Sequence, residues 1–312
     1  MDPQIPVTVS VITYNSSKFV LETLESVKAQ TYQPLILHIC DDCSTDDTIR
    51  ICEKWIADNN NRFVETKIIV PEHNTGVAGN LNRAFDACNT EWLKSIAGDD
   101  ILKPNYIEEN VSYVSEHPEA ALVFSRIEVF GPSQEKNDAI GRLFDYTFFK
   151  MTPEEQYERL IFRGNCLPAA TTFFNVKKMR EMGIRADERI PLLEDYPLWL
   201  NYLKNSVKFH FIDKYLVSYR VGEGGLSAGN KRSLNFIVSM RKAYFYYVFQ
   251  ERFASDPEKV VNEIVDYEMN LRRDVDVILH SPSYRLGCAL LKPLKWIRSK
   301  LNNGDGSCFR KN

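Results

Sequence analysis

The chain has 312 residues, 44% hydrophobic and 26% charged, which is typical of a globular protein that buries a substantial core. Its net charge of −3 and its lack of a zinc-finger or RNA-binding signature exclude nucleic acid as an expected partner. The N-terminal MDPQIPVTVSVI lacks the basic region and long apolar core of a secretory signal. No window approaches the roughly 18 uninterrupted apolar residues of a spanning helix, so we expect a cytoplasmic protein.

The first hundred residues alternate between short apolar runs and segments with helical spacing. The runs at 7–12, 35–40, 67–70 and 92–97 predict four buried strands. A segment with apolar residues three and four apart follows each of the first three runs, and Pro104 opens a helix after the fourth. Such strand–loop–helix units predict an α/β fold, a mostly parallel sheet covered by helices on both faces.

The predicted strands end in polar loops. The first loop, TYNSS, contains no glycine, so neither GxGxxG nor GxxxxGK[ST] cradles phosphate there. A nucleotide held by its base and ribose, with the diphosphate left to a metal, fits this loop better.

Two adjacent carboxylates, Asp99 and Asp100, follow the fourth strand after Gly98. Ligands of open α/β sheets bind at the carboxyl ends of the strands, and neighbouring carboxylates repel unless a cation or polyol shares them. A polar turn that caps nearby amides is the alternative interpretation, and this short motif leaves both open.

The second half is less regular. We expect strands at 121–125 and 126–130, a mobile loop over the site at 131–150, and a small-residue segment at 164–174 that lets a ligand approach the backbone. Glu194 and Asp195 directly precede a predicted helix. Asp195 is a helix cap or a general base, and the spacing alone favours the cap.

Several of these motifs occur together in one order, and the chain resembles the family 2 inverting glycosyltransferases of GT-A fold. The matching segments are VSVITYN (9–15), CDDCSTDDT (40–48), HNTGVAGNLNRAF (73–85), IAGDD (96–100), LEDYPLW (193–199) and SYRVGEGGLS (218–227). The resemblance implies transfer of a sugar from a nucleotide sugar, and it makes the base interpretation of Asp195 the stronger one.

The resemblance also implies roles at the nucleotide. Thr13, Tyr14, Asn15 and Asp42 are expected to line the nucleobase and ribose pocket, with Asp42 accepting a hydrogen bond from a uracil-type imide. Asn80, on the helix after HNTG, is expected to face the nucleotide as well.

Further implied roles concern the sugar, the diphosphate and the acceptor. Asp99 holds ribose or donor-sugar hydroxyls, Asp100 binds Mn²⁺ or Mg²⁺ on the diphosphate, and Arg220 offsets phosphate charge. Asp195 takes the acceptor proton across a cleft, with Glu194 orienting it or contacting the acceptor.

The chain departs from the family pattern at two positions. Gly98 replaces the first acid of an Asp-x-Asp motif, and Gly222 stands where many relatives have a histidine that helps at the metal or diphosphate. We therefore expect weak metal binding without the donor diphosphate.

We expect a catalytic domain at 1–227, with its nucleotide half at about 1–125 and its acceptor half at about 126–227, and a helical region at 228–312. Residues 283–301 are amphipathic and basic, which indicates either peripheral contact with the cytoplasmic face of the inner membrane or a helix docked on the protein.

The expected reaction uses a UDP-sugar donor and a lipid-linked saccharide acceptor in O-antigen or capsule assembly. One rival is a sugar-phosphate nucleotidylyltransferase, which would need a Gly-rich basic loop after strand one. The other is a non-catalytic saccharide-binding module on a degenerate GT-A fold.

Overall fold

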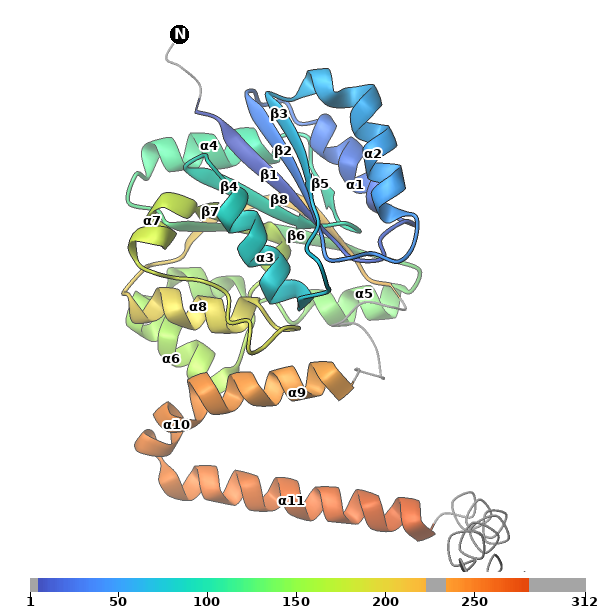
Figure 1. Cartoon of the computed structure of the whole chain (residues 1–312). Coiled ribbons are helices and arrows are strands. Elements are labelled where there is room, and N and C mark those ends of the chain that lie inside the picture. Colours follow the sequence, from blue (N-terminus) through green and yellow to red (C-terminus); the bar gives the residue numbers. More distant parts are fainter. Residues whose placement is uncertain (1–4, 223–233, 281–312) are drawn as a thin grey trace, which may run out of the picture. The chain divides into compact units, whose positions relative to one another are not determined.

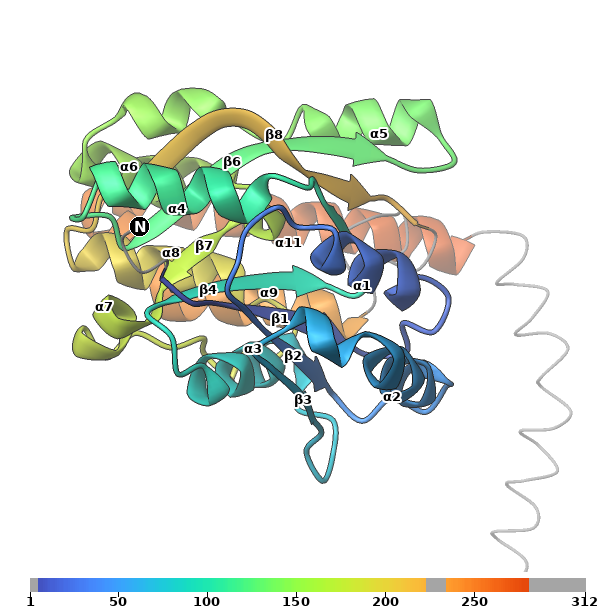
Figure 2. The same cartoon turned by 90° about the horizontal axis from the view of Figure 1, so that it is seen from above.

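The computed structural model describes residues 5–222 and 234–280. The chain forms two compact units that divide between Glu251 and Arg252. The first unit is an eight-stranded sheet with helices on both faces, shown from two directions in Figures 1 and 2. The predicted α/β fold of GT-A type is confirmed, while the domain boundary at residue 227 stays a prediction.

The sheet has the strand order β3-β2-β1-β4-β7-β6-β8-β5. Its strands are β1 (Val7–Thr13), β2 (Leu35–Asp41), β3 (Glu65–Ile69), β4 (Trp92–Ala97), β5 (Ile101–Leu102), β6 (Leu122–Phe130), β7 (Phe173–Asn175) and β8 (His210–Arg220). β1 pairs in parallel with β2 and β4, β2 with β3, and β6 with β8. β4 and β6 each pair antiparallel with β7, and β5 pairs antiparallel with β8. The carboxyl ends of β1, β2 and β4 therefore open onto one edge.

Helices follow most of the strands. The α-helices of the first unit are α1 (Val20–Lys28), α2 (Thr48–Asn59), α3 (Gly76–Ala87), α4 (Tyr106–Glu116), α5 (Gln134–Gly141), α6 (Pro153–Arg163), α7 (Val176–Glu181), α8 (Asp195–Lys204) and α9 (Leu234–Ala243). Shorter helical turns are η1 (Asn60–Arg62), η2 (Tyr146–Lys150), η3 (Ala169–Thr171) and the π-helical η4 (Tyr244–Val248). α10 (Phe249–Ser255) spans the division between the two units.

Two apolar clusters form the core. One contains Val9, Leu24 and Trp55 and joins β1 to α1 and α2. The other contains Phe85 and Trp199 and joins α3 to α8. Burial on both sides explains why the central strands are apolar at most positions.

The four predicted strand–helix units are confirmed, but two expectations for the second half were wrong. The predicted strands 121–125 and 126–130 are one strand, β6, whose pairing with β8 shifts register around Arg126. Such an irregularity lets a polar residue interrupt the apolar pattern without ending the strand. The expected loop at 131–150 holds α5 and η2. α5 buries only Asn137, so its apolar periodicity is too weak to predict a helix.

The second unit contains α11 (Pro257–His280), a long helix within the helical region expected at 228–312. Within this unit Arg252 pairs with Glu263 at 2.8 Å. Among the described helices, none is long and apolar enough to cross a membrane. Residues 283–301 lie outside the described residues, so their predicted membrane contact stays a prediction.

Candidate active site

The loops after β1 and β2 are tied together by short polar contacts. The Thr13 hydroxyl donates to Asp41 Oδ2 at 2.8 Å, and Asp41 Oδ1 accepts from Ser44 N at 2.7 Å. Asn15 has a φ of 51°, in the left-handed region that asparagine tolerates, and its N–H donates to Ser44 Oγ at 2.7 Å. Tyr14 is 51% exposed beside them. These contacts hold the predicted nucleoside residues Thr13, Tyr14 and Asn15 at one edge.

Asp42 holds the start of α3. Its buried carboxylate accepts hydrogen bonds from the backbone N–H groups of Thr75 (2.9 Å) and Gly76 (2.7 Å), and Arg83 lies 3.6 Å away. A carboxylate at a helix N-terminus satisfies orphan amides and the helix dipole. The predicted nucleobase contact of Asp42 stays a prediction, and it would compete with these bonds.

Asn80 joins the ends of the first two strands. Its side-chain amide donates to Cys40 O at 2.8 Å and Thr13 O at 3.3 Å, and its oxygen accepts from Arg83 at 2.6 Å. At 1% exposure it positions the backbone that carries Thr13, and its contact with a nucleotide stays a prediction.

Glycine is required at position 98 because neighbouring atoms lie too close to leave room for a side chain. A Cβ there would lie 2.8 Å from Thr13 Cγ2 and 3.0 Å from Ser16 Oγ, closer than side-chain atoms pack. The Gly98 N–H donates to Ile12 O at 2.9 Å, which keeps β4 against β1 beyond its last paired residue. The missing first acid of the motif therefore has a steric cause.

Asp99 and Asp100 lie beside Arg220 at the end of β8. Asp100 Oδ1 accepts from Arg220 N at 2.9 Å, and Arg220 Nε donates to the Asp99 carbonyl at 2.8 Å. The Arg220 guanidinium also pairs with Glu22 at 2.6 Å and lies between the rings of Phe19 and Phe130, an arrangement suited to the planar guanidinium. The structure thus brings these three predicted residues together.

Burial sets the charge of the two acids. Burial, and then the charge of Asp99, raises the pKa of Asp100 well above its usual range. Burial also raises the pKa of Asp99, and the positive charge of Arg220 opposes that rise. Asp100 is 1% exposed whereas Asp99 is partly exposed, so Asp99 ionises first.

A divalent cation fits this acidic pair, because it would relieve the repulsion that raises the pKa of Asp100. Within residues 5–222 and 234–280, no third carboxylate, histidine or thiol joins the pair at ligand distance. Mg²⁺ and Mn²⁺ accept such incomplete sites when substrate phosphate supplies the remaining oxygens.

Lys94 is a residue of this site that the sequence analysis missed. It lies on β4 with no exposure, and its Nζ donates to the carbonyls of Ala170 (2.5 Å) and Thr172 (3.3 Å). Burial lowers the pKa of Lys94 to about 7, and the charge of Asp100 opposes that change. The sequence does carry a signal for Lys94. It is a lone lysine within a mainly apolar strand, six residues before Asp100.

Glu194 and Asp195 begin α8. Asp195 Oδ2 accepts from Asn165 Nδ2 at 2.6 Å and Oδ1 accepts from Tyr196 N at 2.7 Å, which orients the carboxylate. Burial raises the pKa of Asp195, and burial with the charge of Asp195 raises the pKa of Glu194 to about 8. Asp195 is therefore the member of the pair that ionises first, which suits a general base.

Two sets of contacts link the segments around Asp195 to α3 and to β4. The segment before α8 rests on α3, because Ala78 N donates to Pro191 O at 3.1 Å and a Cβ on Gly76 would lie 2.6 Å from Pro191. Segment 164–174 contacts Asp195 through Asn165 and Lys94 through Ala170. Asn165 had no distinguishing signal in the sequence, because only the fold brings it to Asp195.

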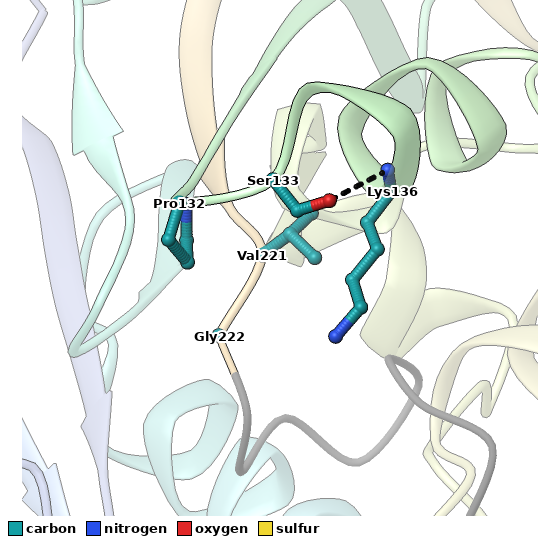
Figure 3. Close-up of a pocket in the computed structure, with 5 residues that line it drawn as sticks. All are labelled: Pro132, Ser133, Lys136, Val221 and Gly222. Carbon is teal, nitrogen blue, oxygen red and sulfur yellow. Dashed lines mark hydrogen bonds between the residues drawn. The ribbon is translucent and has the colours of Figure 1, made fainter.

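The two residues that follow Arg220 in the sequence line a hollow of about 240 Å³ (Figure 3). It is lined by Val221 and Gly222 after β8, by Pro132 and Ser133, and by Lys136 of α5. The Lys136 side chain extends from α5 along this hollow. The position where relatives carry a histidine is thus bordered by a lysine from another element.

Comparison with known proteins supports one family. The sequence profile described as Glycosyl transferase family 2 matches residues 8–179. The chain is 26% identical over 233 residues to Escherichia coli WfaP, named UDP-Glc:alpha-D-GlcNAc-diphosphoundecaprenol beta-1,3-glucosyltransferase, covering 73% of this chain and 82% of that protein. It is 24% identical over 237 residues to EpsE of Bacillus subtilis (strain 168), which is named as a glycosyltransferase, covering 76% of this chain and 78% of EpsE.

A solved structure shares the fold. S. aureus TarS 1-349 in complex with UDP-GlcNAc matches with a TM-score of 0.57 and 19% identity, covering 81% of this chain and 76% of that one. A longer TarS structure is matched over 46% of its own chain. At this identity the likeness shows the fold alone.

Proposed function

The chain belongs to glycosyl transferase family 2, and we propose that it moves a sugar from a UDP-sugar, with inversion, to a hydroxyl of a lipid-linked saccharide. The observation that carries the proposal is the Asp99–Asp100 pair, with Asp100 buried, which Arg220 contacts at the carboxyl edge of the sheet. WfaP, by its name, uses UDP-Glc and an acceptor on diphosphoundecaprenol, which supports the same substrate classes here.

The chain's own residues account for the transfer as follows. The acceptor oxygen attacks the anomeric carbon from the face opposite the diphosphate, the bond to the diphosphate oxygen breaks, and Asp195 takes the acceptor proton. Asn165 and the Tyr196 N–H hold Asp195 in place during this step. Glu194, with its pKa raised to about 8, stays protonated near neutral pH and places no second charge beside the base.

Asp100, with Asp99 adjacent, would hold Mn²⁺ or Mg²⁺ on the donor diphosphate. When bound, that cation would act as a Lewis acid for the departing nucleoside diphosphate. Arg220 lies at the same edge, where its positive charge acts to lower the pKa of both Asp99 and Asp100. In this proposal the uracil and ribose lie against Thr13, Tyr14, Asn15, Asp42 and Asn80.

The acceptor lipid would bring the enzyme to the cytoplasmic face of the inner membrane, and residues 283–301 would contact that face. This part of the proposal rests on the amphipathic, basic pattern of the sequence. Such an enzyme would serve O-antigen or capsule assembly.

The test is a donor panel. UDP- and GDP-sugars are incubated with saccharide-diphospholipid acceptors, with Mn²⁺ and with chelator, and nucleotide release is measured. We expect acceptor-dependent release of UDP that falls in chelator. GDP release alone would contradict the donor, and chelator-resistant turnover would contradict the metal. A panel with no transfer product would favour the rival of a saccharide-binding module.

A further inference from the structure

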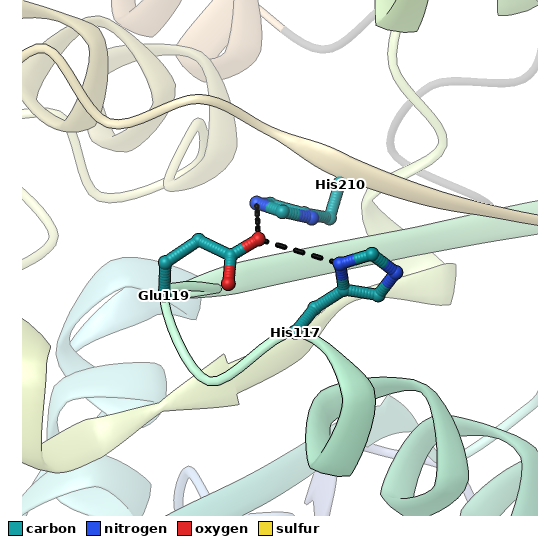
Figure 4. A group of neighbouring side chains, drawn as sticks. All are labelled: His117, Glu119 and His210. Carbon is teal, nitrogen blue, oxygen red and sulfur yellow. Dashed lines mark ion pairs between the residues drawn. The ribbon is translucent and has the colours of Figure 1, made fainter.

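Two histidines and one glutamate meet at the opposite end of β8 from Arg220, and we propose that they bind a divalent transition metal. His117 and Glu119 lie between α4 and β6, and His210 is the first residue of β8 (Figure 4). One donor atom from each lies within 4.8 Å of the other two. Among the described residues, no other group of three such side chains meets this criterion.

The spacing suits a small ion. Glu119 Oε1 lies 3.3 Å from His117 Nδ1 and 3.8 Å from His210 Nε2. Ligands about 2.0–2.1 Å from a tetrahedral Zn²⁺ are separated by about 3.3–3.4 Å, so the three atoms need only small movements to share an ion. Two imidazoles and one carboxylate form a nitrogen–oxygen donor set that prefers Zn²⁺ to Mg²⁺ or Ca²⁺.

The surrounding structure holds these ligands in place. His117 and Glu119 flank Pro118 in a turn closed by Ala120 N donating to His117 O at 3.0 Å. The Lys178 ammonium group donates to the carbonyls of Pro118 (2.5 Å) and Ala120 (3.1 Å). These two bonds fix the same turn, and they direct the charge of Lys178 at the backbone carbonyls.

His210 is held by a second contact. Its Nδ1 lies 3.1 Å from the Tyr113 hydroxyl, while its Nε2 is directed at Glu119 (Figure 4). An Nδ1–H that donates to Tyr113 leaves the Nε2 lone pair for a metal, and this is the outer-shell contact that metal-binding histidines usually make.

A fourth coordination position is available. The three side chains line a cavity of about 590 Å³ that also includes Lys150 and Lys208. Three protein ligands beside an open space are typical of zinc sites that bind water or a further ligand. The two lysines favour an anionic fourth ligand.

This site is distinct from the proposed donor site. β8 runs from His210 to Arg220, and a strand of that length spans up to roughly 33 Å. The site of His117, Glu119 and His210 should therefore keep its metal when the donor site loses its own.

Zinc titration calorimetry of the metal-free full chain, without nucleotide, tests the proposal. We expect one saturable equivalent of Zn²⁺, with the dissociation constant raised at least tenfold in Glu119→Gln and in His117→Gln. These side chains are 64% and 40% exposed, so their replacement leaves the fold intact, as a thermal melt without metal will check. Two matched variants serve as controls: Glu116→Gln, at an exposed neighbour, and Asp100→Asn, at the donor site. We expect their dissociation constants for Zn²⁺ to stay within twofold of the wild-type value.

The Co²⁺ form supplies the second readout. We expect d–d absorption without a thiolate charge-transfer band, because the cluster contains no cysteine. Any one of four results would overturn the proposal. They are no Zn²⁺ binding by the wild type, unchanged Zn²⁺ affinity in Glu119→Gln, lower Zn²⁺ affinity in Asp100→Asn, and a thiolate band in the Co²⁺ spectrum.

Discussion

At the scale of single residues, the site works through pairs of carboxylates whose pKa values are set apart. In each pair one member ionises first, and its charge raises the pKa of its neighbour: Asp99 acts on Asp100, and Asp195 acts on Glu194. The first pair then suits a cation, and the second suits a base that ionises before its neighbour.

Burial raises the pKa of the proposed base Asp195, and Asn165 is one of the hydrogen-bond donors, after the Tyr196 N–H, that lower it. Its hydrogen bond to Asp195 lowers the pKa that burial raises, so Asn165→Ala should raise that pKa further. Because the base acts when ionised, the acidic limb of the kcat/KM profile should move to higher pH. The pH profile of sugar transfer measures this, and Asn205→Ala at the end of α8 serves as the matched control. An unshifted limb with reduced kcat would mean that Asn165 acts only structurally.

Glu194 makes stability depend on pH. Its folded pKa of about 8 lies above the ordinary value of 4.5, so the folded chain holds the proton more tightly. Stability contributed by this group is complete below the ordinary pKa and is lost as pH rises toward 8. Glu194→Gln should therefore raise the free energy of unfolding at pH 8 by roughly 1–3 kcal/mol and leave it nearly unchanged at pH 5. Parallel pH–stability curves from urea unfolding would contradict this.

Gly98 is expected to tolerate no side chain. Because an added Cβ would lie 2.8 Å from Thr13 Cγ2, Gly98→Ala should destabilise the fold by about 1–3 kcal/mol. Urea unfolding measures the change. Gly222→Ala is the matched control, since no described residue lies within 4 Å of a Cβ at that position. Equal stabilities of the two variants would remove the steric explanation for Gly98.

At the scale of elements, the sequence predicts best where one face or both faces of an element are buried. β1, β2 and β4 are apolar at most positions, so their ends can be located in the sequence, and Asp99 and Asp100 are predicted at the ligand edge. β5 and β7 were not predicted, because strands of two and three residues take their form from distant partners. β5 pairs with β8 more than 110 residues later, and no local pattern records that contact.

α5 is an element whose role depends on its position. It brings Lys136 to the hollow beside Gly222, where we propose that the ammonium group offsets charge on the donor diphosphate. Lys136→Met should therefore lower kcat/KM for the donor roughly tenfold, about 1.4 kcal/mol, the scale of one hydrogen bond to a charged group. Lys177→Met is the matched control for loss of a surface charge, because Lys177 is an exposed residue of α7. Steady-state kinetics in which both variants equal the wild type would exclude Lys136 from the donor site.

At the scale of the whole molecule, the halves predicted to bind donor and acceptor are joined by contacts that the sequence does not reveal. The resemblance proposes the site residues, and the fold shows which contacts connect the segments that carry them. Asp42 holds α3, α3 supports the segment at Pro191, and Asn165 and Ala170 join Asp195 to Lys94. These contacts join residues far apart in the sequence, so only the folded chain shows them.

The central claim is that Asp195 is the base of an inverting sugar transfer, and the Asp195→Asn variant tests it most directly. Acceptor-dependent UDP release and UDP affinity are measured for wild type and variant with the donor that the panel identifies. We predict that kcat falls by at least about 10²–10⁴, the usual contribution of a general base, while the UDP dissociation constant is unchanged. Turnover retained in the variant, or UDP binding lost together with turnover, would contradict the account.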